Sequence, residues 1–130
     1  MDQPLDLETR RLLISATLTA QVRRRLGRHV PADSGPAELL DLARGLDEVA
    51  GPVGRAYRLR FDPPYPGVTA GPQGVGGTSR LLLACRVSDQ GGSPIGIVFT
   101  TLIPCRPPQV SVAPPEASIP EGWRPPADFC

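Results

Sequence analysis

Residues 81–103, LLLACRVSDQGGSPIGIVFTTLI, decide the fold of this chain. In the first part of the stretch, apolar side chains recur at every second position, which is the period of a strand with one buried face. They are Leu81, Leu83, Cys85 and Val87. The sequence DQGGS at 89–93 is typical of a turn, and 95–103 predicts a second strand. We expect the two strands to pair as an antiparallel hairpin.

Two shorter strands are predicted on either side of this hairpin. Residues 57–61, YRLRF, alternate between apolar side chains and arginine, which indicates a half-buried strand. Further along the chain, Val110 and Val112 predict a short edge strand. Prolines flank it and protect its edge, since proline donates no hydrogen bond to a ladder. They are Pro107, Pro108, Pro114 and Pro115.

The first half of the chain has a helical period instead. One helix is predicted over 6–28, capped by Asp6 and ended by Gly27. A second is predicted over 36–50, ended by the Gly51-Pro52 dipeptide. The short link between them suits an antiparallel helical hairpin.

The expected fold is therefore α+β, with an N-terminal helical hairpin packed on a three- or four-stranded antiparallel sheet. We expect a single domain over 1–113 and a proline-rich tail over 114–130. Residues 62–79 hold five glycines and four prolines, and they read as a long irregular loop.

The first predicted helix is apolar on two sides. One stripe at helical spacing suits a core, and its members are Leu7, Ile14, Leu18, Val22 and Leu26. A second strip lies on nearly the opposite side and contains Leu12, Leu13, Ala16 and Ala20. A helix that is apolar on two sides tends to be covered on two sides. The second cover is the sheet, the tail or another subunit, and the sequence leaves the three open.

The tail carries the only tryptophan, Trp123, between a glycine and an arginine. Aromatic residues dominate the energetics of both cores and interfaces. Trp123 therefore either folds back onto this chain or anchors a partner, and we weigh these two interpretations equally.

Composition excludes several chemistries. All fourteen basic residues are arginine, as a GC-rich bacterial or phage genome would encode. Without lysine the sequence has no Schiff base, catalytic lysine or P-loop lysine. A formal net charge of +1 provides no broad field that would attract nucleic acid. We expect no cofactor and no metal, because the three cysteines are widely spaced and His29 is the only histidine.

The sequence also predicts where in the cell the protein is found. The acidic N-terminus has no apolar segment of the signal-peptide kind, and no run is long enough to span a membrane. We therefore expect a cytoplasmic protein with reduced thiols, in which Cys85 is a small core residue.

Arginine gathers at the end of the first predicted helix. Arg24, Arg25 and Arg28 are candidates for binding phosphate or another anion. The alternative is that they complement the helix dipole, which is an ordinary role for basic residues in a last turn.

Catalytic groups are sparse. The glycine-rich stretch 71–79 precedes a strand and lacks a lysine, so it reads as a hairpin connection and not as a phosphate cradle. His29 follows a helix end, and Cys105 precedes an arginine, but neither has an evident partner in the sequence.

The sequence favours a non-catalytic protein-binding or assembly module, which associates with itself or docks on a larger complex. The binding residues would be Leu12, Leu13, Ala16 and Ala20, together with Trp123. One alternative is an arginine-mediated nucleic-acid or phosphate binder that uses Arg24, Arg25 and Arg28. The other is a small enzyme that uses His29 or Cys105.

Overall fold

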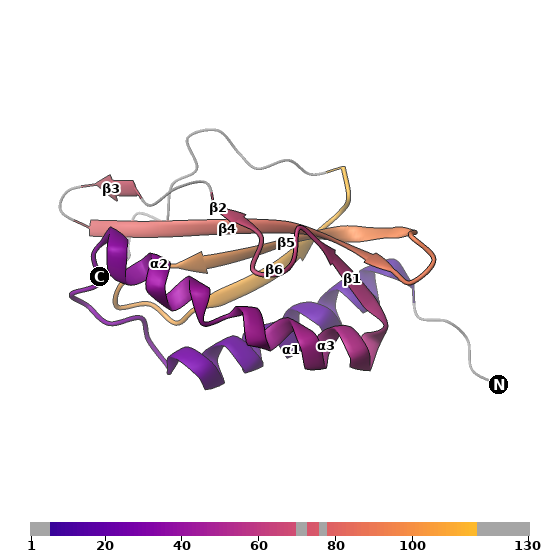
Figure 1. The fold of residues 1–130 in the computed structure, drawn as a ribbon, viewed down its shortest axis with the longest axis horizontal. Helices are drawn as coiled ribbons and strands as arrows, with labels where there is room; N and C mark the ends of the chain where they lie inside the picture. The colour runs from indigo at the N-terminus through magenta and orange to yellow at the C-terminus, as the bar shows by residue number, and fades with distance from the viewer. Residues whose placement is uncertain (1–5, 70–72, 76–77, 117–130) are drawn as a thin grey trace.

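A computed structural model describes residues 6–69, 73–75 and 78–116 of the chain (Figure 1). The helices are α1 (Leu7–Leu26), α2 (Pro36–Arg44) and α3 (Asp47–Tyr57). The strands are β1 (Leu59–Asp62), β2 (Val68–Thr69), β3 (Gln73–Val75), β4 (Thr78–Asp89), β5 (Pro94–Leu102) and β6 (Gln109–Ala113). Most of the predicted tail, including Trp123, lies outside the described residues.

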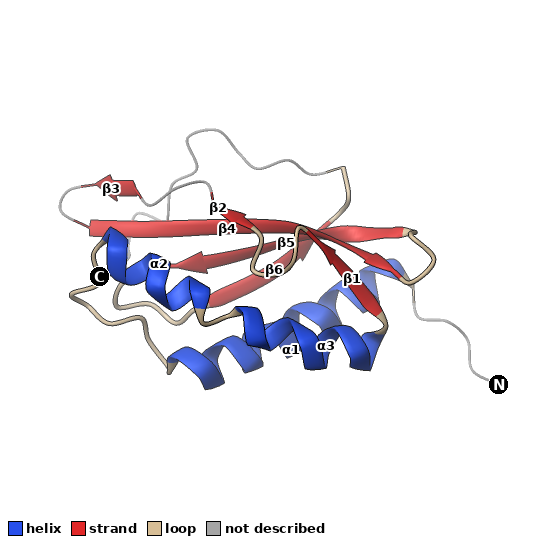
Figure 2. Cartoon of the chain, viewed as in Figure 1, coloured by secondary structure: helices blue, strands red, loops and turns tan. Residues whose placement is uncertain are grey.

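The strands form an antiparallel sheet in the order β1-β4-β5-β6, and β2 and β3 also pair with β4. β4 and β5 pair from Leu81 opposite Leu102 to Val87 opposite Gly96, and they are joined by the predicted turn. All three helices lie on one face of the sheet (Figure 2). The α+β class, the N-terminal helices and the four-stranded antiparallel sheet are thus as predicted.

The predicted caps of α1 are confirmed. Asp6 is the N-cap, and its Oδ1 accepts a hydrogen bond from the backbone N–H of Thr9 at 2.7 Å. At the other end, Gly27 adopts a φ of 99°, a conformation that glycine accepts without steric cost. Ile14, Leu18 and Val22 are buried against the sheet, in one cluster with Val98 and Val110.

The second predicted helix is different in the structure. It breaks at Gly45 and Leu46, and α3 then continues through Gly51 and Pro52 to Tyr57. Proline inside a helix costs about 3 kcal/mol. Val49 and Val53 are buried on the inner side of α3, and burying each contributes about 1.5–3 kcal/mol, which offsets that cost. Pro52 itself is exposed, so its ring displaces nothing in the core.

The helix that runs beside α1 is α3, whereas α2 packs on β4. The helical pair therefore consists of α1 and the second half of the predicted second helix. Two clusters make up the helix-side core: a larger one under α1 and α3, and a smaller one around Leu39 of α2 with Leu81 and Leu83 of β4.

The glycine- and proline-rich segment 62–79 is less irregular than predicted. It contains β2 and β3, and β3 forms an antiparallel pair with the start of β4. Between β1 and β2, Tyr65 is buried in the helix-side core, where its ring meets that of Phe61 edge-on at 5.9 Å between centroids. Gly67 follows at a φ of 97°, and a Cβ there would collide with the Ala84 carbonyl of β4. Only glycine fits so close to the strand.

Tyr65 has a buried hydrogen-bond partner. Its hydroxyl and the Thr100 Oγ1 lie 2.9 Å apart, and both residues are almost fully buried. Burial raises the pKa of the Tyr65 phenol above its usual range, so the hydroxyl keeps its proton in the folded protein.

We predict that Tyr65→Phe lowers the free energy of unfolding by about 1–2 kcal/mol, because the Thr100 hydroxyl is left without a partner. The double variant Tyr65→Phe/Thr100→Val should regain part of that loss, since no buried polar group then remains unpaired. Urea unfolding followed by circular dichroism measures both. Tyr57→Phe is the matched control: the Tyr57 hydroxyl lies 2.9 Å from Thr17 Oγ1 at a part-buried site, so a smaller loss is expected. Equal losses at the two tyrosines would contradict this account.

Candidate functional site

The orientation of α1 about its own axis is fixed by hydrogen bonds to the sheet. Ser15 Oγ donates to the Val110 carbonyl of β6 at 2.8 Å. The single proton of Thr19 Oγ1 is shared between the Ser15 carbonyl within α1, at 2.7 Å, and the Val110 carbonyl, at 3.1 Å. Arg11 Nε donates to the Ile95 carbonyl at 2.7 Å, and Arg23 Nε donates to the Pro108 carbonyl at 3.0 Å. Together with the buried stripe, these contacts leave α1 no freedom to rotate.

This orientation places the second strip of α1 on the surface. Leu12 is 66% exposed and Leu13 is 40% exposed. Ala16 and Ala20 are exposed as well. We call these four residues the α1 strip. No other described helix or strand covers it, so of the covers left open by the sequence, the sheet is eliminated.

The α1 strip lies beside the edge of the sheet formed by β6. Ser15 and Thr19 stand between the strip and that strand, and both bond to the Val110 carbonyl. The Val110 carbonyl of this edge strand therefore already has a hydrogen-bond donor, whereas the exposed apolar side chains of the strip have no cover among the described residues.

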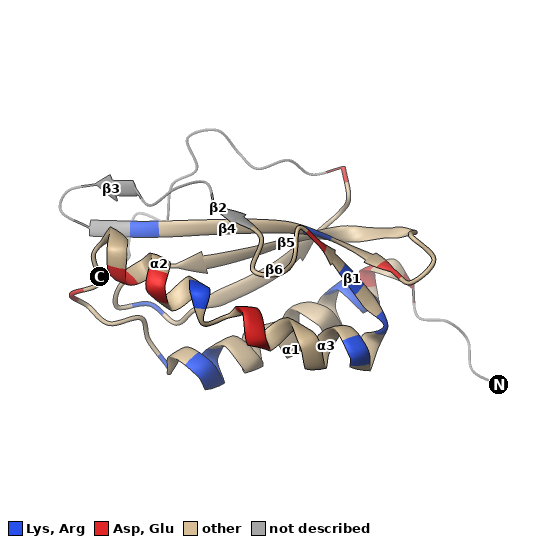
Figure 3. Ribbon diagram, in the orientation of Figure 1, with Lys and Arg blue, Asp and Glu red and all other residues tan. Residues whose placement is uncertain are grey.

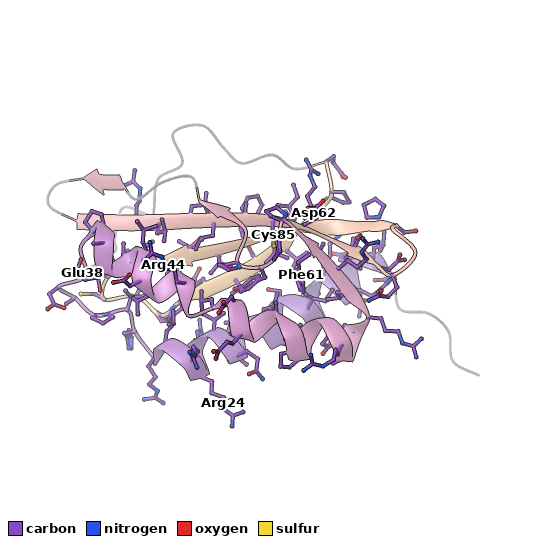
Figure 4. The ribbon with its side chains drawn as sticks, in the orientation of Figure 1. Arg24, Glu38, Arg44, Phe61, Asp62 and Cys85 are labelled. Carbon is purple, nitrogen blue, oxygen red and sulfur yellow. The ribbon has the colours of Figure 1, made fainter. Side chains whose placement is uncertain are left out.

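The arginine cluster is partly engaged within the molecule. Arg25 forms an ion pair with Glu48 of α3 at 3.0 Å. Figure 3 shows this basic end of α1 close to the acidic first turn of α3. Arg24 points away from the protein (Figure 4), and Arg28 is exposed. A shallow hollow of about 290 Å³ lies beside the pair and is lined in part by Arg24, Arg25 and Glu48. The Glu48 carboxylate in this lining weakens the attraction of the hollow for an anion.

A larger hollow of about 430 Å³, which no sequence motif indicates, lies between α3 and β1. Gly51 and Gly54 leave room on α3, while Phe61 and Tyr65 contribute aromatic surface. Figure 4 shows Phe61 on the helix side of β1 and Asp62 on the other side. Tyr65 reaches this hollow through the turn between β1 and β2.

The structure brings the segments of His29 and Cys105 side by side. The Cys105 N–H donates to the Val30 carbonyl at 2.9 Å, and the Val30 N–H donates to the Arg106 carbonyl at 2.9 Å. Over the described residues, however, neither the His29 imidazole nor the Cys105 thiol makes a hydrogen bond or an ion pair. Within the same ranges no group of three or more potential ligands could hold a metal ion.

Cys85 is a core residue, as predicted. It is 2% exposed and lies in the larger core cluster. Burial raises the pKa of its thiol from 9.0 to about 12. The thiolate, which is the nucleophilic form, is therefore suppressed at neutral pH.

Comparisons with protein-family models, with curated protein sequences and with solved structures found no match. Among the helices that the structure describes, none is both long and apolar enough to cross a bilayer. The function of this protein is therefore inferred from the geometry of its own residues.

The raised pKa of Cys85 predicts a loss of stability in alkali. The folded state keeps the thiol proton longer than the unfolded chain does, so the contribution is complete below about pH 9 and declines as the pH rises toward 12. The stability difference between wild type and Cys85→Ala should change across that window by up to about 1.4 kcal/mol per pH unit. Urea unfolding under reducing conditions measures it. The matched control is Val87→Ala on the same strand and face, whose difference from wild type should not depend on pH.

Proposed function

We propose that this protein is a non-catalytic binding or assembly module, and that the α1 strip is its docking surface. The observation that carries the proposal is the exposure of Leu12 and Leu13, at 66% and 40%, on a helix whose rotation is fixed. Elsewhere in the described residues only Leu7 is a large apolar side chain of comparable exposure. A fixed apolar strip on an otherwise polar helix face is typical of a partner surface.

A second copy of this chain suits the strip. Ala16 and Ala20 lie one turn apart, and their small side chains let another helix approach to about 8 Å between axes. Leu12 and Leu13 would then pack across a two-fold axis against the same strip of the other copy. A docking site on a larger complex would use the same residues.

The expected affinity is modest. The exposed fractions of Leu12 and Leu13 add up to about one whole leucine side chain per copy, or about 1.5–3 kcal/mol when buried. Two copies therefore contribute about 3–6 kcal/mol from these side chains. A Kd of 1 mM requires about 4 kcal/mol beyond an association cost of at least about 4 kcal/mol, so even with the further contacts of Ala16 and Ala20 we expect dimers only near 1 mM.

The alternatives have less support. Arg25 is paired with Glu48, and Arg23 donates to Pro108, so two of the clustered arginines already have partners within the chain. A nucleic-acid complex would have to rest mainly on Arg24 and Arg28. Over the described part of the chain, neither the thiol of Cys105 nor the imidazole of His29 forms a hydrogen bond or ion pair with a carboxylate that would orient a base.

The same proposal includes a cytoplasmic location and a bacterial or phage source. Its support is compositional: basic residues that are all arginine, 17 prolines and 14 glycines. In addition, Cys85 and Cys105 are free thiols in the described part of the chain.

We predict that Leu12→Glu/Leu13→Glu abolishes self-association without loss of fold, because both side chains are solvent-exposed in one copy. Sedimentation equilibrium up to about 1 mM should show the mass of wild type rising with concentration and the mass of the variant staying at 13.8 kDa. Leu7→Glu is the matched control. It changes a leucine of similar exposure on the same helix, but outside the strip, and it should dimerise like wild type. A wild-type protein that stays monomeric over the whole range would contradict self-association through the strip.

A further inference from the structure

The sheet has a second apolar face, on the side away from the helices. Along β4 the side chains of Leu81, Leu83, Cys85 and Val87 belong to the helix-side clusters. Their neighbours alternate to the other side, as in any strand. Leu82 is 4% exposed and Ala84 is 3% exposed, yet neither belongs to those clusters.

β5 continues the same surface. Ile97 and Phe99 lie between Gly96, Val98 and Thr100, which face the helices. Ile97 is 5% exposed and Phe99 is half-buried, and both are absent from the helix-side clusters. We call Leu82, Ala84, Ile97 and Phe99 the outer face.

No described helix lies on the outer face (Figure 2). β1, β2 and β3 all pair with an edge of β4, within the plane of the sheet, and so they do not cover it. An antiparallel sheet with one solvated face carries polar side chains there, whereas strands that are apolar on both faces are covered on both. A further segment must therefore cover Leu82, Ala84, Ile97 and Phe99.

We propose that residues 117–130 of this chain fold back across the outer face, and that Trp123 packs on Leu82 and Ile97. The starting point fits. Ala113, the last residue of β6, is opposite Ile97 in the ladder, so its side chain is on the outer face. The chain leaves the sheet at the border of the surface to be covered.

The length also fits. Trp123 is seven positions after Glu116. An extended segment of the polyproline type rises about 3.1 Å per residue, so these seven steps span roughly 22 Å. The distance from β6 to β4 is two strand spacings, or roughly 10 Å. Trp123 therefore reaches the centre of the outer face without strain, and Phe129 has chain left to reach beyond it.

Charge favours the tail over a second copy as the occupant. On the outer side of the sheet, the described strands carry the exposed Arg60 and Arg86 and one exposed carboxylate, that of Asp62. Two copies face to face would bring these arginines together. The tail instead supplies Glu121 and Asp128, and carboxylates match the guanidinium fork.

The outer face and the α1 strip lie on different sides of the molecule, so packing of the tail is independent of the proposed function. Under this proposal Trp123 packs on its own chain and does not anchor a partner. The partner surface then consists of Leu12, Leu13, Ala16 and Ala20 alone.

The test uses the full chain and its single tryptophan. We expect the fluorescence of Trp123 to be blue-shifted relative to the urea-unfolded protein, with acrylamide quenching several-fold lower, at every concentration from dilute monomer upward. Phe99→Ala should move the emission toward red and raise the quenching, with an unchanged far-ultraviolet circular dichroism spectrum. The matched control is Val112→Ala, a half-buried valine of the neighbouring strand that packs on the helix-side core; it should leave the emission as in wild type.

Two outcomes would overturn the proposal. One is emission and quenching equal to those of the unfolded chain, which would mean that Trp123 is in water. The other is a blue shift that appears only as the mass rises with concentration, which would assign Trp123 to a second copy. Both outcomes are measured on the wild-type protein, so neither depends on a variant that has to fold. Neither outcome changes the expected effect of Leu12→Glu/Leu13→Glu on the mass measured by sedimentation equilibrium.

Discussion

β4 is the strand on which the rest of the structure depends. Along one edge it pairs with β5, and along the other it pairs in succession with β1, β2 and β3. Those three short strands have no other ladder partner in the described residues. The helix-side residues of β4 also hold both core clusters, with Cys85 and Val87 under α1 and α3 and Leu81 and Leu83 under α2. Removing β4 would therefore separate the helices from the sheet and the short strands from each other.

The parts of the fold that the sequence predicts are those set by local periodicity. Alternation along 81–103 predicted the central hairpin, and helical spacing with Asp6 and Gly27 predicted α1 nearly to the residue. The parts that it missed are set by contacts far apart in the chain. Pro52 is a local stop signal, but burial of Val49 and Val53 outweighs it. Likewise, β2 follows from Tyr65 reaching Thr100, a partner 35 residues away.

The two apolar surfaces differ in how visible they are in the sequence. The α1 strip is predicted directly by helical spacing, because leucines on opposite sides of one helix cannot all face a single sheet. The outer face is less visible, because the alternating residues of β4 account for one side of the sheet only. Leu82 and Ala84 fill the intervening positions, so 81–85 is an unbroken apolar run. Such a run is the mark of a strand that is covered on both faces, and it is the signal that could have revealed this surface.

The size of each surface also suggests a different use. Burying the outer face is permanent if the tail does it, since a segment of the same chain needs no second molecule and its local concentration is high. The α1 strip provides only about one leucine side chain per copy. Association costs at least about 4 kcal/mol in lost freedom, so a single contact through the strip is transient. Weak contacts of this size become effective only when several form at once, because each one raises the local concentration for the next. The geometry therefore suits a transient pair, or docking of several copies on a repeating surface, better than a tight isolated pair.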